Sequence, residues 1–192
     1  MNKIKNLNIT LDDKFLSRCE IFIDLLQKWG KVHSFTTQLS NEEIENNIID
    51  SIYPLEFLNN FESFADIGTG AGYPGMLLAI ARPNIKCYLI EPRLKRVAFL
   101  NFVKNRLGLK NITIIQSRVE DCKDIKVDLI TSRAVTDTQL LIKLTKNISK
   151  DSSKFLFYKG SLYQNEIDNL DKNKYEIITT SRTRNYLYIK DL

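Results

Sequence analysis

Four glycines lie within eight residues of each other in the stretch FADIGTGAGYPG, which spans residues 64–75. They form the pattern G-x-G-x-G when counted from Gly68, and G-x-G-x-x-G when counted from Gly70. Glycine lets the backbone approach a ligand closely and adopt a positive φ without a Cβ clash. A simple turn between a strand and a helix rarely needs so many glycines. The stretch therefore predicts a loop that holds a nucleoside cofactor.

A carboxylate follows this loop at the distance expected for ribose recognition. Glu91 ends the next apolar run, 23 residues after Gly68. An acid in that place can accept hydrogen bonds from both hydroxyls of a ribose. Both NAD and S-adenosylmethionine carry such a ribose, so Glu91 indicates a nucleoside but does not choose between these cofactors.

Three features favour S-adenosylmethionine over NAD. Asp66 precedes the first glycine by two residues, where an acid can face the ammonium group of a methionine but would repel a pyrophosphate. Glu120 and Asp121 follow a later apolar run, where an acid can accept a hydrogen bond from the exocyclic amine of adenine. The chain also ends in a predicted hairpin, which leaves too few residues for the substrate domain of a dehydrogenase. We therefore expect Gly75 to serve helix packing, while an NAD- or FAD-dependent oxidoreductase stays open as an alternative.

The elements that position these residues begin with a helical segment. Apolar residues recur at steps of three and four over residues 15–29, which predicts a helix that Gly30 ends. Ser40 and Glu43 form a capping box at the start of a second helix. We expect residues 1–60 to form a helical N-terminal segment packed on the core.

From residue 61 onwards, short apolar runs alternate with amphipathic segments, which predicts an α/β fold with a mostly parallel sheet and helices on both faces. Two last apolar runs are joined by a short polar turn, which predicts a terminal antiparallel hairpin. The main domain is expected to span residues 61–192. The expected strands are 64–67, 85–90, 112–116, 127–131, 155–158, 175–180 and 186–189, and the expected helices are 74–81, 94–107, 138–148 and 164–170.

The composition restricts the classes of protein to which the chain could belong. The chain has 192 residues, of which 43% are hydrophobic, enough for one sizeable core. Its net charge of +5 is compatible with a polyanionic partner but not specific for one. The cysteines Cys19, Cys87 and Cys122 are odd in number and far apart, so we expect neither a disulfide framework nor a metal site. No apolar run approaches the roughly 18 residues of a membrane span, so we expect a soluble cytoplasmic protein that does not enter a membrane.

Several longer motifs resemble one family of enzymes. DIGTGAGYPG, EPRLKRVAFL, QSRVED, ITSRAV and FYKG occur in the order and spacing of the ribosomal RNA small subunit methyltransferase G family, and FIDLLQKWGKVHSFTT is similar to its leading helical motif. The resemblance covers almost the whole chain. It implies a Rossmann-like class I methyltransferase fold that uses S-adenosylmethionine to methylate N7 of one guanine in the 530 loop of 16S ribosomal RNA. The implied partner is 16S rRNA or the small ribosomal subunit, and we expect a monomer.

The same motifs imply the site residues. Position by position, the resemblance implies cofactor contacts from Gly68, Tyr73, Val119, Glu120 and Arg133. Because guanine N7 carries a lone pair and no proton, the reaction needs no general base. Arg133 is the predicted catalytic residue, which would reach the methionine end of the cofactor and the guanine or a flanking phosphate with its planar donor fork. The complete predicted cofactor site is Asp66, Gly68, Gly70, Gly72, Tyr73, Glu91, Val119, Glu120 and Arg133.

The chain departs from the family's leading motifs in two places. Gly30 follows Trp29 where the family usually has Asn, and Asn46 and Asn47 replace an Arg-His pair. Both departures lie before residue 60, so we expect them to alter RNA contacts rather than the cofactor site. A catalytically silent RNA-binding or ribosome-assembly module is the second alternative, although the intact glycine loop argues against it.

Basic residues cluster around the predicted site. We expect some of them to hold RNA phosphates, which predicts an affinity that falls with salt. The candidates are Arg93, Lys95, Arg96, Lys104, Arg106, Arg118, Lys159, Arg182 and Arg184.

Overall fold

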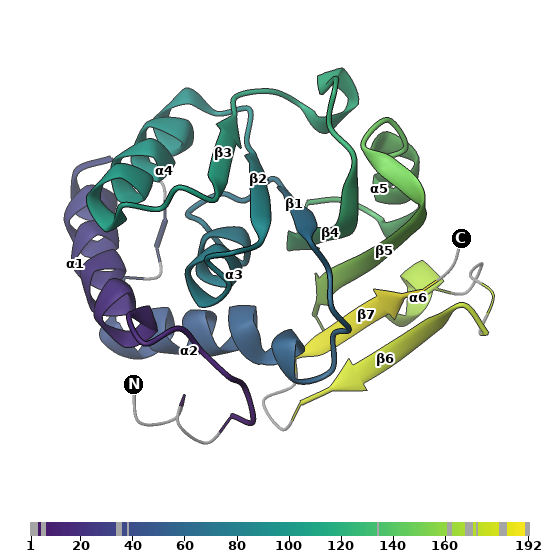
Figure 1. Cartoon of the computed structure of the whole chain (residues 1–192), viewed down its shortest axis with the longest axis horizontal. Helices are drawn as coiled ribbons and strands as arrows, with labels where there is room; N and C mark the ends of the chain where they lie inside the picture. The colour runs from purple at the N-terminus through teal and green to yellow at the C-terminus, as the bar shows by residue number, and fades with distance from the viewer. Residues whose placement is uncertain are drawn as a thin grey trace.

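A seven-stranded sheet forms the centre of the molecule in the computed structural model (Figure 1). The structure describes residues 4, 7–33, 36–37, 39–133, 135–160, 163–167, 171, 173–180 and 184–190. The strand order is β3-β2-β1-β4-β5-β7-β6. The first five strands in this order are parallel, β7 is antiparallel to β5, and β6 is antiparallel to β7. The strands are β1 (Ser63–Ile67), β2 (Lys86–Ile90), β3 (Ile112–Ile115), β4 (Val127–Arg133), β5 (Ser149–Lys159), β6 (Tyr175–Thr179) and β7 (Asn185–Ile189). This mostly parallel sheet with a terminal hairpin confirms the predicted fold class.

Helices cover both faces of the sheet, which explains why its central strands are almost continuously apolar. Figure 1 shows α1, α3 and α4 on one side and α5 on the other. Phe64 of β1 points into a core shared with α1 to α4, whereas its neighbour Ala65 joins a second core with α5. The helical elements are α1 (Phe15–His33), α2 (Asn41–Ile52), η2 (Tyr53–Glu56), α3 (Gly75–Ala81), α4 (Leu94–Leu107), η3 (Val119–Asp121), α5 (Thr138–Leu144) and α6 (Gln164–Ile167).

The N-terminal helices form part of the main core. Ser40 caps α2, because its hydroxyl accepts from the Glu43 N–H at 3.3 Å and the Glu43 carboxylate accepts from the Ser40 N–H at 3.2 Å, which confirms the predicted capping box. Residues of α1 and α2 belong to the same hydrophobic core as α3 and α4. The division at residue 60 therefore stays a prediction, since one core spans it. Among the described residues, no helix is both long and apolar enough to cross a membrane.

Three predicted boundaries were wrong. The helix α1 continues through Gly30 to His33, because Gly30 is an interior packing position where an added Cβ would lie 2.5 Å from Leu39 Cδ2. The predicted helix 138–148 ends at Leu144, after which the Thr145 hydroxyl donates to carbonyl oxygens of the last turn. Strand β5 begins at Ser149 rather than at 155, since its first residues are polar and mostly exposed and give no apolar pattern. Residues 168–170 of the predicted last helix lie outside the described residues.

Candidate active site

The glycine loop between β1 and α3 adopts a conformation that needs glycine at three positions. Gly68, Gly70 and Gly72 have φ angles of 65°, 60° and 98°, in the left-handed region that side chains disfavour. Gly68 also donates its N–H to the carbonyl oxygen of Ile90 at 2.8 Å, which ties the loop to the end of β2. Gly75 serves a different purpose: an added Cβ would lie 2.4 Å from Leu89 Cδ2, which confirms its expected role in helix packing.

Asp66 supports the loop from below. Its side chain is fully buried, with Oδ2 accepting from the Gly75 N–H and Oδ1 from the Thr131 hydroxyl, both at 2.9 Å. Burial raises the pKa of this carboxyl to about 6, although these hydrogen bonds and the nearby Arg133 oppose the shift. The visible role of Asp66 is to join β1, β4 and α3. Its contact with the ammonium group of a cofactor stays a prediction.

A cavity of about 550 Å³ opens beside the loop, at the carboxyl ends of β1 and β2. Ligands of open α/β sheets bind at this edge. Four predicted cofactor residues line it together, although they come from three separate stretches of the chain. These four residues are Gly68, Glu91, Val119 and Glu120.

Glu91 connects this cavity to the glycine loop. Its carboxylate accepts from the N–H groups of Gly70 and Arg93, each at 3.0 Å, and lies 3.5 Å from Arg96 Nη1. The side chain is buried at the cavity wall, with 2% of its surface exposed. Glu91 thus lines the cavity and also anchors the loop, a role that the sequence does not signal, and its contact with a ribose stays a prediction. Gly70 does not line the cavity; it contributes the N–H that Glu91 binds.

The side chains that line the cavity are chemically suited to bind an adenosine moiety. Glu91 offers acceptors for ribose hydroxyls, and Glu120 offers an acceptor for an exocyclic amine. Ile67, Val119 and Leu141 provide apolar surface against which a purine can pack. These residues therefore fit the nucleoside half of S-adenosylmethionine.

Arg133 and Tyr73 lie together on the side of the loop that faces α1 and α2. The guanidinium carbon of Arg133 is 4.9 Å from the centre of the Tyr73 ring, and its Nη1 donates to Asn47 Oδ1 at 2.8 Å. Tyr73 packs edge-on against Phe22 and is 6% exposed, and burial raises the pKa of its hydroxyl. Neither Arg133 nor Tyr73 lines the cavity. Their contacts with a cofactor stay predictions.

Asn47 lies next to a predicted site residue. It was expected to bear on RNA contacts rather than on the cofactor site, and that stays a prediction, but it hydrogen-bonds Arg133, a predicted site residue 86 positions away. No local pattern signals this contact, because it depends on how α2 lies against the sheet.

Several basic residues are paired inside the protein. Lys159 is 9% exposed in its side chain and forms an ion pair with Glu166, and Arg184 forms one with Asp50 at 2.9 Å. Such pairs leave less charge for RNA phosphates than expected. The candidates that remain exposed include Arg93, Lys95, Arg106 and Arg118, whereas Arg182 lies outside the described residues.

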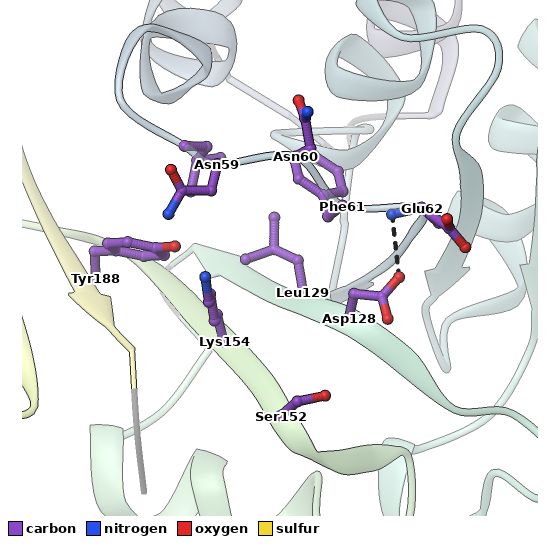
Figure 2. A pocket seen from close by; sticks show the side chains of 10 residues that line it. Asn59, Asn60, Phe61, Glu62, Asp128, Leu129, Ser152, Lys154 and Tyr188 are labelled. Atoms are coloured by element: carbon purple, nitrogen blue, oxygen red, sulfur yellow. Dashed lines mark hydrogen bonds between the residues drawn. The ribbon is translucent and has the colours of Figure 1, made fainter.

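A second cavity, of about 350 Å³, lies at the opposite edge of the sheet, near the starts of β1 and β4 (Figure 2). Figure 2 shows Asn59, Lys154 and Tyr188 around it, with Leu129 beneath them and Asp128 accepting from the Glu62 N–H at 3.1 Å. No predicted site residue lines it. Within the part of the chain that the structure describes, no three His, Cys, Asp or Glu side chains come together to hold a metal ion.

Comparison with known proteins decides the family. The family model GidB, described as rRNA small subunit methyltransferase G, matches residues 16–185. The chain belongs to the rRNA small subunit methyltransferase G family. Because the match begins inside α1 and ends at the start of β7, it includes the helical segment as well as the glycine loop and the cavity.

Two relatives support this membership of the methyltransferase G family, and one solved structure shows the same fold. The ribosomal RNA small subunit methyltransferase G of Aliarcobacter butzleri is 56% identical over 96% of this chain and 95% of its own length. The protein of the same name from Wolinella succinogenes is 44% identical over 97% of this chain and 95% of its own. A SAM-dependent methyltransferase from Aquifex aeolicus matches in fold, with a TM-score of 0.56 and 17% identity over 68% of this chain and 82% of that one.

Proposed function

We propose that this member of the methyltransferase G family transfers the methyl group of S-adenosylmethionine to N7 of one guanine in the 530 loop of 16S rRNA. One observation carries the proposal: in a chain of this family, Gly68, Glu91, Val119 and Glu120 meet at one cavity on the carboxyl edge of the sheet. Their chemistry fits the nucleoside of that methyl donor. 16S rRNA or the small ribosomal subunit is the proposed partner, in the cytoplasm.

The chain's own residues have a limited chemical task in this reaction. When bound, S-adenosylmethionine supplies a methyl group on a positively charged sulfur. Guanine N7 needs no deprotonation, so the protein has to align the reactants at about 3 to 3.5 Å and exclude water. We assign ribose binding to Glu91, adenine binding to Val119 and Glu120, and close backbone approach to Gly68.

Arg133 is assigned to the methionine end of the cofactor and to the guanine. It extends from the carboxyl end of β4, whose Ser132 pairs with Ile67 of β1, directly before the glycine loop. A guanidinium can bridge two acceptors through its planar fork of donors. A cation at this place also suits either a carboxylate or a phosphate.

The exposed arginines at the mouth of the cavity are assigned to RNA. Arg93 and Arg118 both line this cavity and are solvent-exposed, and Arg118 keeps 74% of its side-chain surface exposed despite Glu120 at 3.8 Å. Phosphate contacts of this kind position a nucleic acid without reading its sequence. The target guanine would leave its stack to reach the cavity.

Mass spectrometry of RNA incubated with the protein and S-adenosylmethionine tests the proposal. The expected product is 7-methylguanine in 16S rRNA, formed by the wild type and not by Gly68→Val. A product without 7-methylguanine would contradict it. Calorimetric titration with S-adenosylhomocysteine and with NAD distinguishes the methyltransferase from an oxidoreductase. Tight binding of NAD alone would overturn the assignment. Binding of RNA without any methyl transfer would instead favour the silent assembly module.

A further inference from the structure

Helix α2 is fixed to the carboxyl edge of the sheet by its second half. Arg184 binds Asp50 Oδ2 through two nitrogens, at 2.9 and 3.0 Å. The Tyr186 hydroxyl donates to the Asp50 carbonyl oxygen at 3.0 Å, and the Tyr158 hydroxyl donates to that of Ser51 at 2.7 Å. Tyr158 lies in β5 and Tyr186 in β7, and Arg184 directly precedes β7. The preceding turn of α2 lies over the end of β4, where Asn47 meets Arg133.

The residue that this turn presents to β4 is Asn47. Its side chain is buried, with 7% of the residue exposed, and Oδ1 accepts from Arg133 Nη1 at 2.8 Å. A guanidinium carries five N–H donors. Within the described ranges, Asn47 accepts the one hydrogen bond that Arg133 is seen to donate. The ring of Tyr73 holds the guanidinium from another side, at 4.9 Å.

We infer that Asn47 is a positioning residue for Arg133, supplied to the site by the helical N-terminal segment. The inference rests on the proposed function, in which Arg133 contacts the cofactor and the guanine. An aromatic face attracts a guanidinium but does not fix its rotation, whereas one directed hydrogen bond does. With one nitrogen held by Asn47, the other donors keep a constant orientation for a ligand. A displacement of about 1 Å in such a group can cost roughly 100-fold in rate.

Two near-isosteric variants separate positioning from packing. Asn47→Leu removes the acceptor but keeps a side chain of similar volume, and we expect kcat to fall roughly tenfold, as for the loss of a hydrogen bond to a charged group. Asn47→Asp keeps an acceptor oxygen at the same reach, so it should retain most of the wild-type kcat. Both variants should retain the wild-type KM for RNA, because Asn47 is buried and offers little surface to that substrate.

A double-mutant cycle tests whether Asn47 acts through Arg133. The expected result is that Asn47→Leu lowers kcat in the wild-type background and has no further effect in Arg133→Ala. The matched control is Tyr186→Phe, which removes another hydrogen bond to α2 without changing charge or touching Arg133. It should lower the melting temperature and leave kcat unchanged. Thermal unfolding of all variants separates misfolding from the loss of positioning.

Three outcomes would overturn the inference. These are a wild-type kcat for Asn47→Leu, full additivity with Arg133→Ala, or an equal loss of kcat in Tyr186→Phe. If the wild type transferred no methyl group to guanine, the proposed function would fail separately. The same cycle would then be measured as affinity for S-adenosylhomocysteine, where equal affinities in all four proteins would contradict the inference.

Discussion

Glu91 and Arg133 both contact the glycine loop, but the chain holds them by different means. Glu91 lies at the end of the strand that follows the loop and binds the backbone N–H groups of Arg93, two residues away, and of Gly70, in the loop after the neighbouring strand. Arg133 depends on Tyr73 and on Asn47, which belongs to a helix 86 residues earlier. The proposed nucleoside side of the site is therefore built by local geometry, and the Arg133 side by long-range packing.

This contrast has a functional consequence. A change before residue 60 should leave nucleoside binding intact and affect methyl transfer, because α2 reaches Arg133 and not the cavity. A change in the loop or at Glu91 should affect cofactor binding first. Variants on each side therefore test whether the two parts of the site act independently.

The largest effect is expected for Glu91→Ala. It removes both the proposed ribose acceptor and the anchor of Gly70, so affinity for S-adenosylhomocysteine should fall by roughly two to three orders of magnitude. Isothermal titration calorimetry measures this change. Glu62→Ala is the control, because it removes a carboxylate from the cavity at the opposite edge. Equal affinities in wild type and Glu91→Ala would show that the nucleoside binds elsewhere.

Asp66→Asn should change how stability depends on pH. The pKa of Asp66 is raised by burial from 3.8 to about 6, so its proton binds more tightly in the folded state. Its contribution to stability is therefore fully present below about pH 4 and is lost as pH rises through 6, a change of about 3 kcal/mol. Asn can accept from Gly75 and donate to Thr131, so the variant should fold and lack this component.

Chemical unfolding of both proteins between pH 4 and 7 measures that difference. The free energy of unfolding of the wild type relative to Asp66→Asn should decrease across this interval. Parallel curves would mean that Asp66 does not titrate there and that its burial has little energetic effect.

Gly75→Ala tests the packing beneath the loop. The new Cβ would lie 2.4 Å from Leu89 Cδ2 and 2.6 Å from Asp66 Cβ, and overpacking of this kind costs about 2 kcal/mol. Urea unfolding should show the loss. Gly160→Ala is the matched control, since nothing lies within 4 Å of its added Cβ. Equal stability of the two variants would show that an added methyl group at Gly75 fits beside Leu89 and Asp66, contrary to these distances.

The smallest effect is expected for Arg118→Ala. Loss of one phosphate contact should weaken RNA binding a few-fold and reduce the slope of log affinity against log salt by about 1. Fluorescence anisotropy at several salt concentrations measures both quantities. Lys110→Ala removes an exposed charge just before β3, at the amino edge, and should leave the slope unchanged. An equal decrease of this slope in both variants would indicate general electrostatic attraction of RNA rather than a phosphate contact at the cavity.

Much of the fold was predictable because its signals are local. Alternation of apolar runs with amphipathic segments predicted the sheet, and Ser40 with Glu43 predicted the start of α2. The failures arose where tertiary contacts replace local signals. Gly30 is typical of a helix end, yet it lies inside α1 because Leu39 packs against it. The polar start of β5 has no apolar period, although backbone pairing with β4 makes it a strand.

The candidate site shows the same limit. Gly68, Glu91 and Glu120 could be grouped in advance, since each follows a strand at the same edge of a parallel sheet. The bond between Asn47 and Arg133 could not, because it requires the position of α2 relative to β4. Sequence alone also gave no sign that Lys159 and Arg184 would be used in internal ion pairs.

The most direct test of the central claim is to map 7-methylguanine along 16S rRNA by borohydride and aniline cleavage, in cells with and without the gene. We expect one cleavage site, within the 530 loop, to disappear on deletion. The wild-type gene should restore it, and a Gly68→Val gene should not. An unchanged cleavage pattern after deletion would contradict the account.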